Sequence, residues 1–177
     1  MIPPLPAFPR AFWVEPGRLL GGPYPGDRVA AKATAQLCAL LDVGVRTVIC
    51  LQPPEERGHG GARFLPYTAE LERLAAERGV AVSWFRHPIP DWGVTTPENV
   101  RLILRCIDES PDAVYLHCWG GHGRTGTIAG VWLRERGLSA DEAFERLRVA
   151  RLHDAHMAAE SCPQSEAQKA MVRGWSG

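Results

Sequence analysis

The sequence predicts a single α/β domain in which a central, mostly parallel sheet of about four to five strands is flanked by helices on both faces. Two observations support this prediction. Short β-branched or apolar runs alternate with longer segments of helical periodicity through most of the 177 residues, an order typical of parallel sheets with helical crossovers. The length also fits one domain, and no internal repeat divides the chain.

The first elements are expected to be an extended segment and a β-hairpin. Residues 1–10 hold four prolines, which favours an extended conformation. We therefore take residues 1–11 as a proline-rich N-terminal segment and residues 12–177 as the domain. The apolar runs at 12–14 and 18–20 are separated by Glu15, Pro16 and Gly17, a sequence typical of a tight turn.

The remaining strands and helices follow from apolar periodicity and from capping residues. The expected strands are apolar, largely β-branched runs at residues 45–51, 80–85 and 113–117. The expected helices cover residues 28–41, 68–78, 124–136, 140–151 and 164–172, with another that starts at Pro97. Asp27, Thr68 and Thr96 are candidate N-caps. Ser139 and Glu142 have the spacing of a capping box.

Four segments lack the pattern of a strand or a helix. Residues 53–66 are polar and rich in Gly, Arg and Glu, and residues 87–93 carry prolines that exclude a helix. Residues 118–123 are rich in glycine, and residues 153–162 have no clear period. The functional residues considered below lie mainly in the second and third of these segments.

Charge and cysteine content exclude several classes of protein. Twenty basic and twenty acidic side chains leave no net charge, so no global field favours nucleic acid or anionic lipid, and any bound anion must be held by local geometry. The five cysteines are irregularly spaced, without a C-x-x-C pair, which does not fit a secreted disulfide framework. No run of eighteen apolar residues occurs. We expect a cytoplasmic protein without a membrane span or a nucleic-acid partner.

The most informative stretch joins the strand at 113–117 to the helix that begins near Arg124. Gly120, Gly121 and Gly123 allow successive backbone N–H groups to turn inward as an anion-binding nest. The N-terminus of the helix adds unpaired N–H groups and the positive end of its dipole. Cys118 lies at the bottom of this predicted cup, where the same dipoles stabilise a thiolate. The guanidinium of Arg124 offers a bidentate fork for two phosphate oxygens.

These residues resemble the H-C-x-x-G-x-G-R-T signature of cysteine-dependent protein tyrosine and dual-specificity phosphatases. Residues 88–94 (PIPDWGV) resemble the acid loop of the small, atypical dual-specificity phosphatases. Residues 139–143 and 162–168 resemble two helix starts that follow the signature in that family. The resemblance covers roughly residues 12–173 and implies the dual-specificity phosphatase fold, with residues 12–177 as a phosphatase domain.

Chemistry assigns roles to several residues of this predicted site. The Cys118 thiolate attacks phosphorus, and Asp91, 27 residues upstream, protonates the leaving group and later accepts a proton from water. Glu98 and Asp108 are alternative acids, but both fall on a predicted helix. Thr125 is placed to donate a hydrogen bond to the sulfur.

Two further roles concern residues on either side of the nucleophile loop. His117 is expected to orient the loop from behind as a satisfied core histidine rather than to titrate. The resemblance implies that Gln168, or else Gln164, positions the attacking water. The expected phosphate-binding residues are Trp119, Gly120, Gly121, His122, Gly123 and Arg124.

Several side chains have two possible roles at this point. Trp119 either shapes the rim of the cup or packs under it. The resemblance places lysines that bind additional phosphates of lipid substrates at the positions of Trp119 and His122. Because neither residue is a lysine here, a phosphoinositide substrate is less favoured, although it is not excluded. Cys50 either forms a redox disulfide with Cys118, as the resemblance implies, or packs in a core strand.

No metal site and no cofactor are expected. The candidate ligands lack a suitable fourfold arrangement, and the H-x-x-H spacing of two of them does not place both on one helical face. These candidates are Cys118, His122, His153, His156 and Cys162.

The predicted function is a metal-independent phosphomonoesterase that acts first on phosphotyrosine in proteins, with phosphoserine and phosphothreonine as further substrates. No separate loop that presents a tyrosine to a phenyl ring can be identified, which favours a shallower, dual-specificity pocket. The runner-up is a phosphatase of inositol phosphates, phosphoinositides or other small phosphate esters. Rhodanese-like enzymes and arsenate reductases fit poorly, since the cysteine comes late in the chain and the aspartate early. A binding module without turnover would lack the nucleophile or the arginine. We expect the protein to act as a monomer.

Overall fold

A five-stranded, mostly parallel sheet lies at the centre of the computed structural model, which describes residues 7–176. The strands are β1 (Phe12–Glu15), β2 (Leu19–Gly22), β3 (Val45–Cys50), β4 (Ser83–Arg86) and β5 (Ala113–His117). Their order across the sheet is β1-β2-β5-β3-β4. The edge strand β1 runs antiparallel to β2 as the predicted hairpin, and every other pair is parallel. The predicted α/β class and strand count are therefore confirmed.

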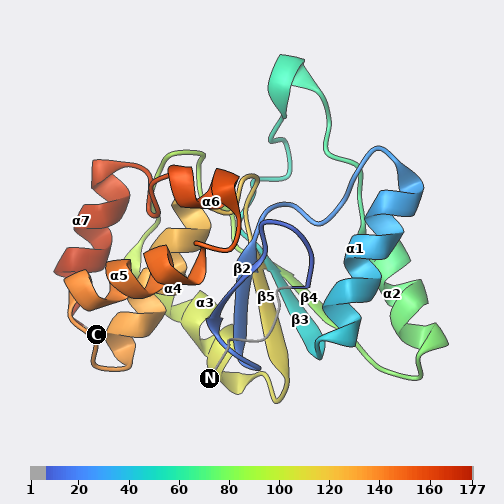
Figure 1. Cartoon of the computed structure of the whole chain (residues 1–177), viewed down its shortest axis with the longest axis horizontal. Helices are drawn as coiled ribbons and strands as arrows, with labels where there is room; N and C mark the ends of the chain where they lie inside the picture. The colour runs from blue at the N-terminus through green and yellow to red at the C-terminus, as the bar shows by residue number, and fades with distance from the viewer. Residues whose placement is uncertain (1–6, 177) are drawn as a thin grey trace.

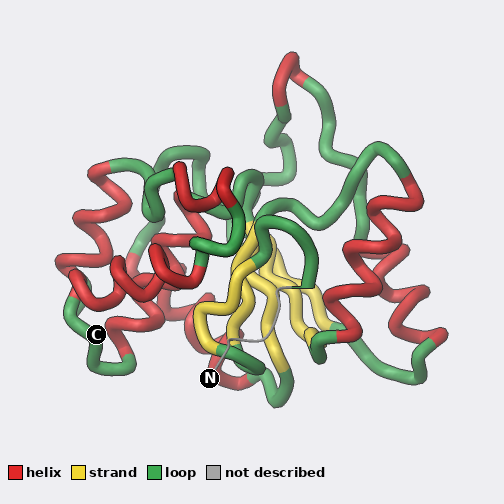
Figure 2. Tube along the Cα trace, in the orientation of Figure 1, coloured by secondary structure: helices red, strands yellow, loops and turns green. Residues whose placement is uncertain are grey.

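Helices cover both faces of this sheet (Figure 1). On one face lie α1 (Ala30–Asp42) and α2 (Thr68–Glu77). The other side carries α3 (Pro97–Glu109), α4 (Gly123–Glu135), α5 (Ala140–Ala150), α6 (Ala155–Ala159) and α7 (Glu166–Gly174). Figure 2 shows the same two groups of helices with the strands between them. No helix in residues 7–176 is long and apolar enough to cross a membrane.

Two apolar layers, one on each face, hold the sheet and helices together. Because side chains alternate along a strand, Val114 and Leu116 of β5 join the layer under α3, α4, α5 and α7, whereas Tyr115 joins the layer under α1 and α2. In α3 the predicted stripe from Val100 to Ile107 is buried. Each fully buried aliphatic or aromatic side chain contributes about 1.5–3 kcal/mol. The strand β5, which leads directly to Cys118, is thus fixed from both faces.

The N-terminal segment contributes to one of these layers. Phe8 and Ala11 are buried among the residues under α1 and α2, and the Phe8 ring lies 5.8 Å from the ring of Tyr115. The first six residues of the expected 1–11 segment lie outside the described part of the chain.

The helix starts agree only in part with the predicted caps. Thr96 accepts a hydrogen bond from the Asn99 amide, and Ser139 forms the predicted capping box. The predictions for Asp27 and Thr68 were wrong. Asp27 accepts from the amide of Val29, which is itself the N-cap, so the helix begins two residues later than expected. Thr68 is the first helical residue of α2 rather than its cap.

Two other boundaries differ for identifiable reasons. The strand expected at 80–85 is β4, which begins only at Ser83, because the Val80 amide instead closes α2 by donating to the Ala75 carbonyl at 3.0 Å. The segment 153–162, without a clear period in the sequence, contains the short helix α6. Asp154 caps this helix by accepting from the Met157 amide at 3.0 Å, and the Met157 side chain is fully buried.

Because β2, β3, β4 and β5 are parallel, the loops that follow them meet at one edge of the sheet, where α/β proteins bind ligands. Residues 53–66 form an arm that extends beyond this edge (Figures 1 and 2). The arm folds back on itself through a bridge between Arg57 and Arg63 and a 2.8 Å hydrogen bond from the Gly58 amide to the Ala62 carbonyl. Its tip is a single turn, His59–Gly61.

Candidate active site

The loop between β5 and α4 depends on close backbone packing. Gly121 has a φ of +80°, and a Cβ there would lie 2.5 Å from the carbonyl carbon of Gly22, so only glycine fits. The Tyr24 amide donates to the Trp119 carbonyl at 2.9 Å and ties the loop to the segment after β2. The loop is held from the β2 side, and α4 begins at Gly123 directly after it.

Cys118 lies at the floor of a cup of about 490 Å³, with 3% of the residue exposed. Asp91, Trp119, His122 and Arg124 line the same cup. The Thr125 hydroxyl donates to the Cys118 sulfur at 3.1 Å. The tertiary structure therefore brings Asp91, Arg124 and Thr125 together around Cys118, as the sequence predicted.

The Arg124 guanidinium is only 2% exposed and has a carboxylate partner that sequence reasoning missed. Glu56, from the base of the arm, accepts from Nη1 and Nη2 at 2.5 and 2.9 Å. Nη1 also donates to the Ile89 carbonyl at 3.2 Å, and Nη2 lies 2.9 Å from the Asp91 carboxylate. Burial by itself lowers the pKa of Arg124, but the Glu56 hydrogen bonds together with the nearby acidic groups of Cys118, Glu56 and Asp91 outweigh it and raise that pKa. Arg124 stays charged.

Asp91 is half-exposed on a loop that is tied to the start of α7. The residue after it, Trp92, has a φ of +59°, an uncommon conformation for a residue with a side chain. The Ser165 hydroxyl donates to the Trp92 carbonyl at 3.0 Å, and the Gln168 side-chain amide donates to the Gly93 carbonyl at 3.1 Å. These contacts hold the acid loop beside the cup.

Gln168 does not line the cup, in contrast to its predicted place beside an attacking water. Its side chain is fully buried, and its Oε1 accepts from the amides of Gln164 and Ser165 at 3.1 and 3.0 Å. With the bond to Gly93, the amide group is occupied as a helix cap and as a support for the acid loop. Gln164, the alternative, does line the cup.

His117 is fully buried behind the nucleophile in a chain of hydrogen bonds. The Trp84 indole donates to the Tyr67 hydroxyl at 2.8 Å, and that hydroxyl lies 2.6 Å from His117 Nε2. His117 Nδ1 lies 3.1 Å from the Cys118 carbonyl. Since a carbonyl only accepts, Nδ1 carries the proton and Nε2 accepts from Tyr67. Burial lowers the pKa of His117 to about 3, so the ring is neutral.

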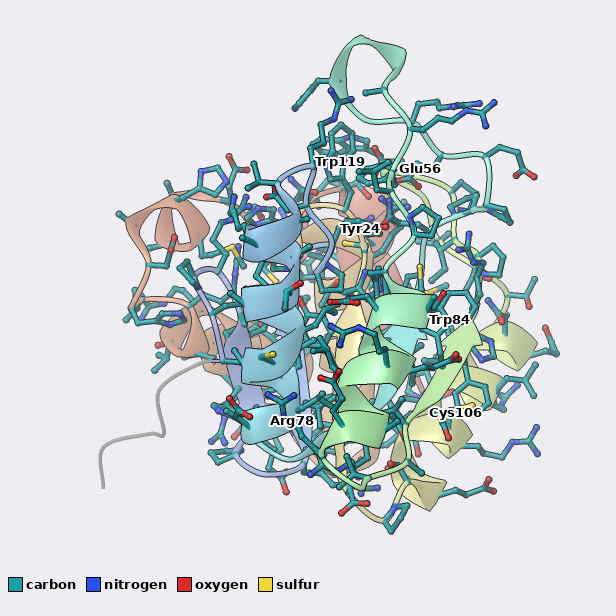
Figure 3. All side chains as sticks on the ribbon, turned by 90° about the vertical axis from the view of Figure 1, so that its right-hand side faces the viewer. Tyr24, Glu56, Arg78, Trp84, Cys106 and Trp119 are labelled. Atoms are coloured by element: carbon teal, nitrogen blue, oxygen red, sulfur yellow. The ribbon has the colours of Figure 1, made fainter. Side chains whose placement is uncertain are left out.

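Trp119 forms one wall of the cup, against the arm. Its ring centroid lies 4.7 Å from that of His59 and 5.6 Å from that of Phe64. Phe64 in turn lies 4.8 Å from Tyr24. In Figure 3, Trp119 and Glu56 are seen at the foot of the arm with Tyr24 below them. Trp119 was expected either at the rim of the cup or beneath it. The structure places it at the rim, where its ring packs against residues of the arm.

His122 is buried beside a second arginine that the sequence did not indicate. Arg151 donates to His122 Nδ1 at 2.5 Å and to the Glu160 carbonyl at 3.1 Å. Arg151 is 2% exposed, and no carboxylate in the described part of the chain pairs with it. Burial, then the Arg151 charge, lowers the pKa of His122 to about 4. The ring is therefore neutral, with its remaining proton on Nε2.

Cys50 ends β3 directly beside β5, where it pairs in register with His117. It is buried, and burial raises its pKa. Cys162 is partly buried in the layer under α3, α4, α5 and α7, and a Cβ at Gly126 would lie 2.4 Å from its sulfur. Neither cysteine is in a disulfide, and residues 7–176 contain no group of His, Cys, Asp or Glu side chains arranged to hold a metal ion.

Comparison with known proteins shows a match to one protein family. A family model described as "PTP-SAK: Swiss Army Knife protein, DSP-PTPase phosphatase domain" matches residues 9–172. The uncharacterized protein MJ0215 of Methanocaldococcus jannaschii is 38% identical over 64 residues, which cover 34% of this chain and 40% of that protein. Tyrosine-protein phosphatase cdc-14 of Caenorhabditis elegans is 38% identical over 61 residues, 33% of this chain and 9% of that protein. The matches thus span less than half of either relative.

Solved structures match over nearly the whole chain. Tk-PTP in its active form is 26% identical, with a TM-score of 0.65 over 94% of this chain and 95% of that one. Kinase associated phosphatase is 18% identical, with a TM-score of 0.64 over 95% of this chain and 93% of that one. The latter likeness supports the fold alone.

Replacing Glu56 by Gln should reduce both activity and stability. The amide keeps the shape of the side chain but leaves the buried Arg124 charge with Asp91 as its remaining carboxylate partner. We expect a loss of about 2 kcal/mol in the free energy of unfolding, the range for weakened hydrogen bonds to a charged group, and at least a tenfold loss in kcat/KM for an aryl phosphate. Urea denaturation and steady-state kinetics measure the two effects. Glu55→Gln, an exposed neighbour, is the matched control, and equal effects of the two substitutions would contradict the role given to Glu56.

Stability should fall as the pH drops below about 6.5, partly because of His117 and His122. Both have a folded pKa below the value of about 6.5 expected in the unfolded chain, so the unfolded chain binds more protons as the pH falls. Each contributes a slope of up to about 1.4 kcal/mol per pH unit. In denaturation between pH 7 and pH 5, His117→Asn should show a shallower slope than the wild type. The exposed His153→Asn should keep the wild-type slope, and an unchanged slope in His117→Asn would refute the prediction.

Proposed function

Because the chain belongs to the DSP-PTPase phosphatase domain family, we propose that it hydrolyses phosphotyrosine in proteins through a phosphocysteine at Cys118, without a metal ion. Membership of the family makes it a cysteine-based phosphatase and confirms the resemblance found in the sequence. The observation that carries the rest is the cup itself, in which Cys118 and Arg124, from the segment after β5, meet Asp91 from the loop after β4. A phenyl ring carries its phosphate farther from the peptide backbone than a seryl or threonyl side chain does, so a floor this deeply buried favours phosphotyrosine.

In the first half-reaction the Cys118 thiolate attacks phosphorus while the bond from phosphorus to the ester oxygen breaks. Asp91 in its acid form gives its proton to the departing oxygen. The contacts of Arg124 indicate how the phosphate is held. Nη1 is occupied by Glu56 and Ile89, so the phosphate takes the Nη2 position where Asp91 now lies, together with the Nε–H. Substrate binding then displaces Asp91 from Arg124 toward the leaving group.

In the second half-reaction water attacks phosphorus, Asp91 accepts a proton from it, and the bond from sulfur to phosphorus breaks. The Thr125 hydroxyl stabilises the departing thiolate through the 3.1 Å hydrogen bond already present. His117, held by Tyr67, fixes the Cys118 carbonyl and so positions the nucleophile. Gln164 is better placed than Gln168 to orient the water, since it lines the cup.

Small phosphate esters are the second candidate, favoured by the cationic and imidazole groups around the cup. Arg10, His59 and His156 line it together with His122. A panel of phosphopeptides, inositol phosphates and nucleotides separates the candidates. A kcat/KM at least ten times higher on inositol phosphates than on phosphotyrosine peptides would make small phosphate esters the preferred substrate class.

The mechanism predicts a defined pattern for hydrolysis of an aryl phosphate. EDTA should leave the rate unchanged, Cys118→Ser should abolish it, and Asp91→Asn should lower kcat by about 10²–10⁴-fold, the range for loss of a general acid. Asp112→Asn, an exposed aspartate away from the cup, controls for the substitution itself. A metal requirement or an active Cys118→Ser variant would exclude the mechanism.

Oxidation should join Cys118 to Cys50 if Cys50 is its redox partner. Peroxide converts the Cys118 thiolate to a sulfenic acid and is itself reduced to hydroxide. The Cys50 sulfur then displaces the hydroxyl group of the sulfenic acid to form the disulfide, and this group leaves as water with the proton of the Cys50 thiol. In a variant whose other three cysteines are replaced by alanine, peptide mass mapping after peroxide treatment should show the Cys50–Cys118 crosslink. Sulfinic acid at Cys118 without a crosslink would leave Cys50 as a core residue. In the wild type, a Cys118–Cys162 crosslink would also contradict the assignment.

A further inference from the structure

A second cavity adjoins the cup on the other side of Trp119. It measures about 460 Å³, and Arg10, His59, Trp119 and Gly120 line both spaces. Beyond Trp119 its walls carry Arg28, from the segment before α1, and Arg63, from the arm. We call this space the basic groove. A molecule seated in the cup with any extension past Trp119 enters it directly.

The groove concentrates positive charge that the protein itself does not neutralise. In residues 7–176, Arg10, Arg28 and Arg63 form no ion pair with a carboxylate. The one acidic side chain among the lining residues, Asp27, is already taken by Lys32 at 2.7 Å and by the Val29 amide at 2.9 Å. The chain as a whole has equal numbers of basic and acidic side chains. The unpaired arginines are therefore a local excess beside the active site.

The backbone segments that carry the arginines of the groove are held in place by contacts with the rest of the protein. Arg10 has a φ of +69°, a conformation that is unfavourable for a residue with a side chain and persists only where neighbouring residues enforce it. The enforcing residues are Phe8 and Ala11, which are buried and joined by a 3.0 Å hydrogen bond. This turn places Arg10 at the rim of both spaces.

On the opposite wall, the arm is docked on the body of the protein. Phe64 packs against Tyr24 and Trp119, and the Tyr24 hydroxyl donates to the Leu65 carbonyl. Burial raises the pKa of Tyr24 to about 12, so this hydroxyl keeps its proton. Arg63 and His59 are thus carried on an anchored segment that faces Arg10 and Arg28 across the groove.

From this arrangement we propose that the basic groove binds a second phosphate of the substrate whose first phosphate is hydrolysed in the cup. The proposal rests on the proposed function and specifies its substrate class, a molecule with two phosphates close together. A ligand with a single carboxylate would need only one of the three arginines as its partner, whereas a phosphate can accept hydrogen bonds from several. The guanidinium fork also matches phosphate oxygens in a bidentate manner. The second phosphate comes either from a phosphorylated polyol or from a neighbouring phosphorylated residue of a peptide.

Matched substrate pairs test the proposal. One pair is a phosphotyrosine peptide with and without a phosphoserine two residues away, and the other is an inositol bisphosphate and the corresponding monophosphate. At constant ionic strength, kcat/KM should be at least tenfold higher for the doubly phosphorylated member of one pair, and that pair identifies the source. The preference should come mainly from KM and weaken at high salt. Arg28→Ala combined with Arg63→Ala should abolish it while hydrolysis of para-nitrophenyl phosphate stays within twofold of the wild type.

Arg105→Ala, an exposed arginine on α3 outside both cavities, is the control and should retain the preference. Absence of a preference in both pairs, or a preference that survives in the double variant, would overturn the role of the groove. Failure of the wild type to hydrolyse any monoester, para-nitrophenyl phosphate included, would instead refute the proposed function. The two failures are therefore distinguishable.

Discussion

The buried guanidinium of Arg124 is the constraint on which the active site depends. A charge taken out of water is costly unless it is paired and hydrogen-bonded, and Arg124 meets this condition with partners from two other loops. Glu56 comes from the arm after β3, while Ile89 and Asp91 come from the loop after β4. One buried charge therefore joins the three segments that follow β3, β4 and β5, and holds Asp91 and Cys118 at the same cup.

Two neutral histidines complete the support of the nucleophile loop. His117 lies behind Cys118 and receives its hydrogen bond from Tyr67, whereas His122 lies beside the cup and receives one from Arg151. In both cases the neighbour occupies one ring nitrogen and so decides which nitrogen carries the proton. Arg10 and Arg124 line the cup, and their charge does not depend on pH in the physiological range.

The fold could be predicted because its information is local. Strands such as Ala113–His117 and the amphipathic face of α3 follow from periodicity over a few residues, and the box Ser139–Glu142 from a spacing of three. The errors lie where local signals compete. Asp27 precedes the true cap by two residues, and Val80 closes a helix although its side chain favours a strand.

By itself the sequence determined the chemistry of the loop from Cys118 to Thr125, because nucleophile, glycines and arginine are contiguous and the resemblance they carry is specific. Tertiary structure alone decided which residues support that loop. Glu56 reaches Arg124 across 68 positions, and Tyr67 reaches His117 across 50. The tertiary structure also decided that Gln168 donates a hydrogen bond to the loop that carries Asp91, and that Arg10, Arg28 and Arg63 line one groove. Buried polar partners are selected by the register of parallel strands and the packing of loops at their ends, and no periodicity in the chain encodes those pairings.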